Sequence, residues 1–149
     1  MPVFVHSLVR RVHIREAVVG RIVQRMLCMV GEESSEISIE FIGDARMRRL
    51  NRVYRQSDRT TDVLAFAARE AEGPSLSMLG DVVVSVPMAV RQAKSLGHSL
   101  SEELARLLIH GVLHVVGYDH ERSYQDAQRM QRKEHRIFTA IKPFPKLVE

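Results

Sequence analysis

The sequence HGVLHVVGYDH, which runs from His110 to His120, places three histidines at spacings of four and six residues. Side chains four residues apart on an α-helix point to the same side, so His110 and His114 are expected to face one ion together. Gly117 can adopt the left-handed backbone conformation that a sharp reversal needs, and this reversal would bring in His120 as a third ligand. The stretch therefore predicts a helix, a tight turn and a metal ion held by His110, His114 and His120.

The chemistry of this motif points to hydrolysis. Three neutral imidazoles leave the fourth position of a tetrahedral Zn²⁺ ion open to water, as in catalytic zinc sites. The spacing equals that of the zinc-protease signature H-E-x-x-H-x-x-G-x-x-H, but Gly111 stands where those proteases have their general-base glutamate. The motif therefore predicts a metal-dependent hydrolase with a substrate other than a peptide. It does not fix the metal, because nickel, cobalt and copper also bind such sites.

The segment around the motif has the pattern of a central, buried helix. Ser99 and Glu102 form a capping box at its start, and the helix is expected to run to about Val116. Burying two imidazoles on such a helix costs stability unless a metal or hydrogen bonds satisfy them, which favours the metal site. Apolar residues surround the helix on nearly all sides: Leu104, Leu107, Leu108, Val112, Leu113 and Val115.

Outward from this helix, the hydrophobic pattern predicts a mixture of strands and helices. Strands are expected at 3–8 (an edge strand), 36–41 (with one solvent-facing side), 62–68 and 81–86, with a loop at 69–80. Further helices are expected at 13–30, 44–55 (with Asp44 as N-cap), 87–97 and 123–141. No repeat or linker divides the chain, so residues 1–149 are expected to form a single α+β domain. We expect a mixed sheet of about four strands packed with helices, the metal-binding helix at its centre as in zincins.

Composition and charge are those of a soluble globular protein, with 45% hydrophobic and 27% charged residues. The single cysteine, Cys28, excludes an intramolecular disulfide, and its apolar surroundings predict a buried side chain. The sequence contains no apolar run of membrane-spanning length and no signal peptide, so a cytoplasmic protein without membrane contact is expected. A net charge of +4 weakly favours a polyanionic partner. Surface positions are expected for the other histidines: His6, His13, His98 and His135.

The helix expected at 44–55 carries arginines along one side. Arg48, Arg52 and Arg55 fall within about 60° of one another on a helical wheel. The core side is expected to hold Met47, Leu50, Val53 and Tyr54. The arginines are interpreted either as a solvated charged side or as a phosphate-binding stripe, since the planar guanidinium fork suits phosphate oxygens. A neighbouring metal site favours the second interpretation, because phosphodiester hydrolysis needs a cation to neutralise charge developing on the phosphoryl oxygens.

Four sequence motifs together resemble one known family. They are HGVLHVVGYDH at 110–120, LNRVYR at 50–55, TDVLAF at 61–66 and GDVVVS at 80–85. In these motifs and their order the chain is similar to the YbeY family, bacterial metal-dependent endoribonucleases. Two positions depart from the family pattern: Ala65 stands where the family often has serine, and Ala67 where it often has proline. Neither departure removes a proposed ligand.

The resemblance implies a zinc-dependent, single-strand-specific endoribonuclease. It implies one Zn²⁺ ion on His110, His114 and His120, and Arg55 as the arginine associated with RNA cleavage. It also implies a role in 3′-end maturation of small-subunit rRNA and in ribosome quality control. The implied partners are rRNA, the small ribosomal subunit and ribosome-assembly proteins. Asp119 is open between two interpretations, an acceptor that orients a histidine ligand and a turn residue; it is also a candidate general base.

Three alternatives remain from the sequence alone. The first is a zinc peptidase, which the ligand spacing favours and Gly111 opposes. The second is a non-catalytic, ribosome-associated protein in which the metal holds the C-terminal turn in place. The third is a metal-dependent hydrolase of another phosphoester, such as a small nucleotide, although the arginine stripe favours a longer polyanion.

Overall fold

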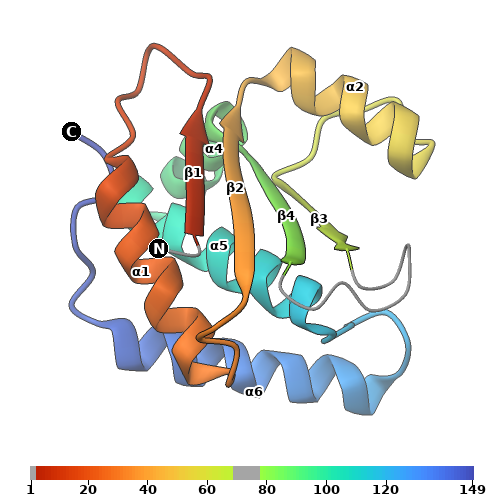
Figure 1. The fold of residues 1–149 in the computed structure, drawn as a ribbon. Coiled ribbons are helices and arrows are strands. Elements are labelled where there is room, and N and C mark those ends of the chain that lie inside the picture. Colours follow the sequence, from red (N-terminus) through yellow and green to blue (C-terminus); the bar gives the residue numbers. More distant parts are fainter. Residues whose placement is uncertain (1–2, 69–77) are drawn as a thin grey trace.

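The computed structural model describes residues 3–68 and 78–149, and its strands join in one mixed sheet (Figure 1). The strands are β1 (Val3–Ser7), β2 (Glu36–Ile42), β3 (Val63–Ala67) and β4 (Met78–Ser85), in the spatial order β1-β2-β4-β3. β1, β2 and β4 run parallel, and β3 runs antiparallel to β4. The mixed four-stranded sheet with β1 at its edge confirms the expected fold class.

Helices cover one side of this sheet, with α5 at the centre (Figure 1). They are α1 (Glu16–Met29), α4 (Val86–Leu96), α5 (Leu100–Val116) and α6 (Tyr124–Ile141). α5 packs on β3 and β4 and is flanked by α1, α4 and α6. Ser99 caps its first turn by accepting a hydrogen bond from the Glu102 amide at 3.1 Å. The buried central helix is therefore confirmed, with both ends as expected.

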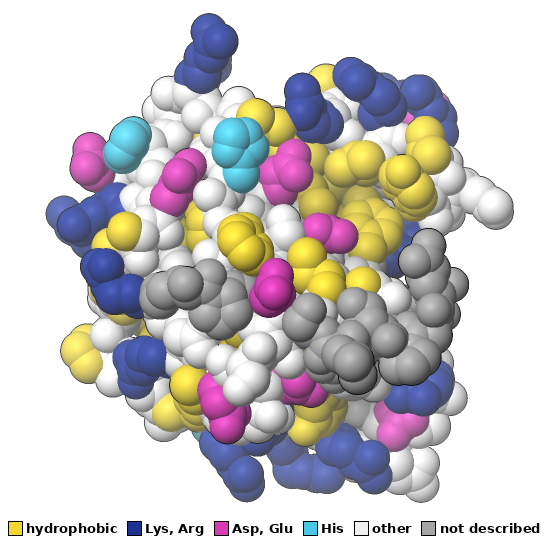
Figure 2. Space-filling view, in the orientation of Figure 1, with side chains coloured by type: hydrophobic (Ala, Val, Ile, Leu, Met, Phe, Trp, Pro, Cys, Tyr) yellow, Lys and Arg dark blue, Asp and Glu magenta, His cyan; other side chains and the backbone are white. Residues whose placement is uncertain are grey.

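The alternation of β2 explains which side the helices cover. Ile37, Ile39 and Phe41 are fully buried beneath the helices. The intervening side chains of β2 lie on the opposite side, and none of its glutamates is fully buried. Among the described helices, α2 (Asp44–Arg55) alone packs on that side, where Met47 meets a small second core with Val83. Figure 2 shows hydrophobic and acidic side chains on this face, with Lys and Arg around the rim.

The start of α1 differs from the expectation. The helix begins at Glu16 rather than at His13. Ile14 instead forms a β-bridge with Val148, and the Arg15 amide donates to the Leu147 carbonyl at 2.8 Å. Residues 13–15 thus form backbone hydrogen bonds with the C-terminal segment instead of the first turn of a longer helix.

The predicted start of β4 and the predicted N-cap of α2 were also wrong. β4 begins at Met78, so the last three residues of the predicted loop belong to the strand, and residues 69–77 lie outside the described part. The N-cap of α2 is Gly43, and Asp44 is its first helical residue. The Asp44 carboxylate accepts from Arg91 of α4 at 2.9 and 3.0 Å, so it links two helices instead of capping one.

The core side of α2 is narrower than predicted. Met47 and Asn51 are buried, whereas Val53 and Tyr54 are 61% and 60% exposed. The Tyr54 ring contacts the edge of Phe66, with ring centroids 5.3 Å apart. α2 covers only part of the sheet, so part of the apolar side of α2 has no packing partner among residues 3–68 and 78–149.

Two other side chains lie in environments that the pattern did not predict. Cys28 is exposed, because α1 buries Met26 and Leu27 and the next position turns toward solvent. His98 is not a surface residue: its Nε2 lies 2.6 Å from Glu103 Oε1 at the start of α5. The other three non-motif histidines are exposed, as expected. No helix within 3–68 and 78–149 is both long and apolar enough to cross a membrane.

Candidate metal centre

The end of α5 brings three histidines together. His110 and His114 lie one turn apart, and Gly117 follows with a φ of 122°, in the region that favours glycine. Its amide donates to the His114 carbonyl at 3.1 Å, which closes the helix end. The chain then reverses and places His120 beside the other two rings. The structure thus contains the predicted helix, turn and histidine cluster.

The geometry of this cluster fits a zinc-type cation. The ring centroids are 4.7 Å apart for His110 and His114, and 5.2 and 5.1 Å from these two to His120. One nitrogen from each ring lies within 4.8 Å of the other two. His114 Nε2 and His120 Nδ1 are 3.2 Å apart. Two nitrogens on one tetrahedral zinc ion are separated by about 3.3 Å, so the spacing of these donors suits such an ion.

The environment of His114 keeps its ring neutral. Burial lowers the pKa of His114 below its ordinary value, and the neighbouring His110 and His120 lower it further. The lowered pKa favours the neutral imidazole at neutral pH, and only the neutral form has a lone pair for a metal. His120 is exposed, so the cluster opens to solvent on that side.

Gly111 packs against the sheet. A Cβ atom built on it would lie 2.5 Å from Val82 Cγ1 and 3.4 Å from Val63 Cγ2. The glycine therefore lets α5 lie close to β3 and β4. A glutamate at this position would collide with β4 instead of facing the histidines, so this chain has no room for the general base of the zinc proteases.

A carboxylate from another helix lies beside His110. Glu134 Oε2 of α6 is 3.0 Å from His110 Nδ1. Asp119 plays no such part: its Oδ1 accepts from the Glu121 amide at 2.8 Å and stabilises the turn. Sequence analysis missed Glu134, because it lies 24 residues away on a different helix, where no spacing rule links it to the motif.

Arg55 shares a cleft with the histidine cluster. It lies at the end of α2, where Nη2 donates to the Ala65 carbonyl at 2.9 Å and the guanidinium lies 5.2 Å from the centre of the Phe66 ring. The contact uses the backbone of residue 65, so the departure from the family's serine leaves it intact. Among the side chains that the structure describes, no carboxylate forms an ion pair with Arg55. Its charge is therefore available to an anionic ligand.

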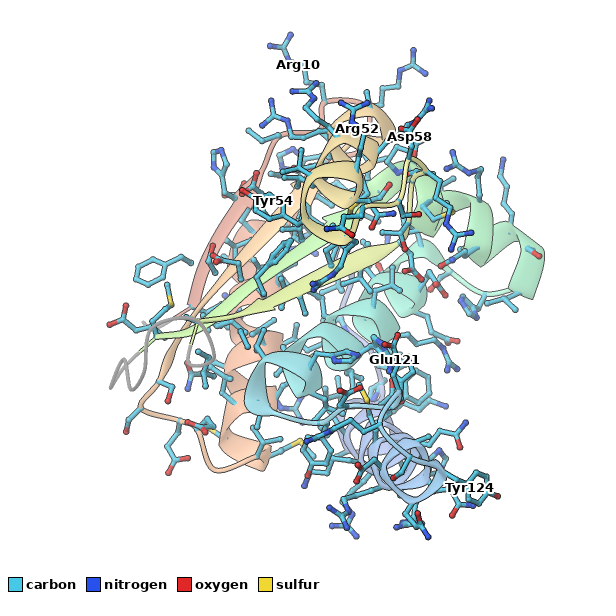
Figure 3. All side chains as sticks on the ribbon, turned by 90° about the vertical axis from the view of Figure 1, so that its right-hand side faces the viewer. Arg10, Arg52, Tyr54, Asp58, Glu121 and Tyr124 are labelled. Carbon is cyan, nitrogen blue, oxygen red and sulfur yellow. The ribbon has the colours of Figure 1, made fainter. Side chains whose placement is uncertain are left out.

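The other two arginines of the predicted stripe have a different role. Asp58 accepts from Arg48 at 2.9 and 3.1 Å, and Arg52 Nη1 lies 3.7 Å from the same carboxylate. Figure 3 shows Arg52 and Asp58 near the top of the molecule, far above Glu121, which follows His120. The stripe is thus divided: two arginines share the single carboxylate of Asp58, and Arg55 alone of the three lines the cleft of the histidines.

Comparison with known proteins gives one consistent result. The family model described as "Endoribonuclease YbeY" matches residues 7–142. The chain is 44% identical over 124 residues to the Endoribonuclease YbeY of Geobacter metallireducens, covering 81% of this chain and 83% of that protein. It is also 44% identical over 145 residues to the Endoribonuclease YbeY of Pelotomaculum thermopropionicum, covering 92% and 95%.

A solved structure shares the fold. The solution structure of TM1509 from Thermotoga maritima has a TM-score of 0.65 and 20% sequence identity, and the match covers 93% of this chain and 88% of that one. At this level of identity the likeness concerns the arrangement of helices and strands alone.

Proposed function

Because the chain belongs to the YbeY family of endoribonucleases, we propose that it cleaves single-stranded RNA with one zinc ion held by His110, His114 and His120. The observation that carries the proposal is the single cleft that contains the three imidazoles and the guanidinium of Arg55. The proposed natural substrate is small-subunit rRNA, at its 3′ end. Ribosome quality control is the wider proposed role, with the small subunit and its assembly proteins as cytoplasmic partners.

Each part of the cleft has a task in phosphodiester cleavage. A zinc ion bound there would supply Lewis acidity and lower the pKa of water toward neutrality. Arg55 would bind the non-bridging phosphoryl oxygens and neutralise the charge that grows on them. Its contacts with the Ala65 carbonyl and the Phe66 ring hold the guanidinium in place before RNA arrives.

Two aspartates that line the cleft are engaged in structural contacts. Asp62 Oδ1 accepts from the Val63 amide at 2.7 Å, and its Oδ2 accepts from Gln92 at 3.3 Å. Asp119 is held by the turn. We therefore assign no proton transfer to either aspartate.

The packing of Gly111 argues against the peptidase alternative. A peptidase of this ligand spacing needs a glutamate there. The contact with Val82 leaves no space for one unless α5 moves off the sheet. The proposed substrate class therefore stays RNA rather than peptide.

The proposal is tested by incubating the purified, zinc-loaded chain with ribosomal RNA beside three variants. His114→Ala removes a proposed ligand, and Arg55→Glu reverses the charge in the cleft. Arg49→Glu is the matched control, because it reverses an exposed charge on α2 that does not line the cleft. We expect cleavage by the parent and by the control, and losses of at least 100-fold in the two site variants.

The outcomes separate the alternatives. Equal cleavage by the parent and all three variants would mean a contaminating nuclease and would overturn the proposal. Zinc binding with no cleavage of any RNA would favour the non-catalytic, ribosome-associated alternative. Cleavage lost in His114→Ala but intact in Arg55→Glu would keep the metal centre and remove Arg55 from the site.

A further inference from the structure

Glu134 reaches the metal centre from α6, an element outside the histidine motif. Its Oε2 lies 3.0 Å from His110 Nδ1, and both side chains are about one-third exposed, at 30% and 31%. Within the described part of the chain, the Glu134 side chain has no other hydrogen bond or ion pair. The carboxylate is therefore directed at the imidazole alone.

This contact determines which nitrogen of His110 can bind a metal. An ionised carboxylate only accepts hydrogen bonds, so the proton of a neutral His110 ring resides on Nδ1. Nε2 then carries the lone pair. The nitrogens of the other two rings already face each other, with His114 Nε2 3.2 Å from His120 Nδ1. A fixed Nε2 on His110 completes a three-nitrogen set in which each ring offers one lone pair.

The packing of α6 holds the carboxylate in position. Met130 lies one helical turn before Glu134, and Ile137 and Phe138 lie one turn after it. Met130 and Ile137 are fully buried, and Phe138 is 9% exposed. These side chains anchor α6 against α5 on both sides of the glutamate. The anchored backbone keeps Glu134 beside α5, where its carboxylate reaches His110.

The cations near Glu134 are occupied elsewhere. The guanidinium of Arg106 lies 4.1 Å from the centre of the Phe138 ring, and Lys142 Nζ lies 4.7 Å from it. Arg106 also pairs with Glu102 at 3.4 Å. Neither cation forms an ion pair with Glu134, which keeps the full acceptor strength of its carboxylate for His110.

We propose that Glu134 is a positioning residue that sets the tautomer and orientation of His110 and so strengthens metal binding. This inference rests on the proposed metal centre. Groups that hold a histidine ligand from behind commonly contribute 10- to 100-fold to metal affinity. The sequence motif alone therefore does not contain the whole site: a residue of the C-terminal helix belongs to it.

The test compares zinc dissociation constants, measured by competition with a chromophoric chelator, for the parent, Glu134→Ala, Glu134→Gln and Gln131→Ala. Gln131 is the matched control, because it lies one turn earlier on α6 and lines the same side of α5 without a bond to His110. Glu134→Ala should bind zinc roughly 10- to 100-fold more weakly. Glu134→Gln should lose less, since its amide oxygen still accepts from Nδ1, and the control should match the parent.

A second readout does not depend on zinc. Nitrogen NMR of the metal-free chain should show the His110 proton on Nδ1 in the parent, and a shift toward Nε2 in Glu134→Ala. Unchanged zinc affinity and an unchanged tautomer in Glu134→Ala would overturn the inference. A parent chain that binds no zinc would overturn the proposed metal centre, while the tautomer measurement would still decide what Glu134 does to His110. If Glu134→Ala fails to fold, Glu134→Leu, whose side chain cannot accept a hydrogen bond, provides both measurements.

Discussion

At the scale of single residues, Gly111 sets how closely α5 approaches the sheet. A methyl group there would press on Val82 at 2.5 and 3.2 Å, which is closer than side-chain carbons tolerate. The helix carries the histidine cluster, so the same contact also fixes where that cluster lies relative to β3 and Arg55. A helix displaced from the sheet would separate the two halves of the cleft.

Gly111→Ala is therefore expected to lower the free energy of unfolding by about 1–3 kcal/mol, the usual cost of overpacking. Gly20→Ala is the matched control, because its added methyl group would lie 3.9 Å from Val5 Cγ2, an ordinary contact. On α1 the alanine should raise stability by up to about 1 kcal/mol through better helix propensity. Urea denaturation of the two variants measures both, and equal stability for them would contradict the packing account.

Arg55 is the residue on which phosphate binding is proposed to depend. Arg55→Lys keeps the charge but loses the planar fork and the stacking on Phe66, so we expect roughly 100-fold slower RNA cleavage. Zinc affinity should stay unchanged, since no proposed ligand is altered. Single-turnover cleavage and chelator competition measure the two quantities, and a lysine variant with full activity would show that charge alone suffices.

Some residues of the site could be predicted from the sequence, and others could not. Gathering His110, His114 and His120 needed only a helical period and a glycine turn, which are local rules. The contact of Glu134 with His110 depends instead on how α6 packs against α5. The role of Arg55 came from the family resemblance. The structure adds that, among the described residues, Asp58 pairs with Arg48 and Arg52 and no carboxylate pairs with Arg55.

At the scale of elements, α2 and α4 are joined by Asp44. Its carboxylate accepts two hydrogen bonds from Arg91 and further ones from Thr60 and Ser85, each at 3.3 Å. The hydrogen bond from Arg91 is the main cause that lowers the pKa of Asp44 below its ordinary 3.8. α2 carries Arg55, so this junction also helps to place the arginine over the cleft.

Asp44→Asn should lower the melting temperature by about 2 °C at neutral pH, a modest change because the pair is half exposed. The sign with pH follows from the lowered pKa: the stabilisation is complete above pH 3.8 and is lost as the pH falls through the folded-state pKa. The difference between parent and variant should thus shrink below pH 3.8. Thermal melts from pH 7 to 2.5 measure it, and a difference that grows in acid would contradict the assignment.

The ends of the helices show which features local sequence signals can predict. The ends of α5 were predicted correctly, because a capping serine and a glycine lie at them. The start of α1 was predicted wrongly, because Ile14 forms a β-bridge with Val148. The N-cap of α2 was predicted wrongly as well, and the Asp44 carboxylate accepts hydrogen bonds from Arg91 instead. Both partners are remote in sequence, and remote partners override local propensity.

At the scale of the whole molecule, metal binding should be linked to folding. The three proposed ligands lie at the junction of α5 and the turn before α6, and they are brought together only in the folded chain. A metal that binds the native state alone stabilises it by RT ln(1 + [L]/Kd), or about 2.7 kcal/mol at 100 times the Kd. Zinc should thus raise the melting temperature of the parent by several degrees and leave His114→Ala nearly unchanged. Calorimetry with and without zinc measures this, and equal shifts in both would place the ion elsewhere.

The fold class was predictable because the hydrophobic pattern distinguishes strands from helices and one apolar helix lies at the centre. The spatial order β1-β2-β4-β3 and the packing of α2 on the opposite side of the sheet were not predicted. They depend on which strand edges pair, and the hydrophobic pattern of a strand does not contain that information.

The central claim is that RNA cleavage depends on a metal ion at the histidine cluster. The most direct measurement is the cleavage rate of one single-stranded RNA by the chelator-stripped chain, before and after one equivalent of zinc. The account predicts no cleavage by the stripped chain, recovery with one equivalent, and no recovery in His114→Ala. Cleavage by the stripped chain at the full rate, with zinc absent by elemental analysis, would contradict it.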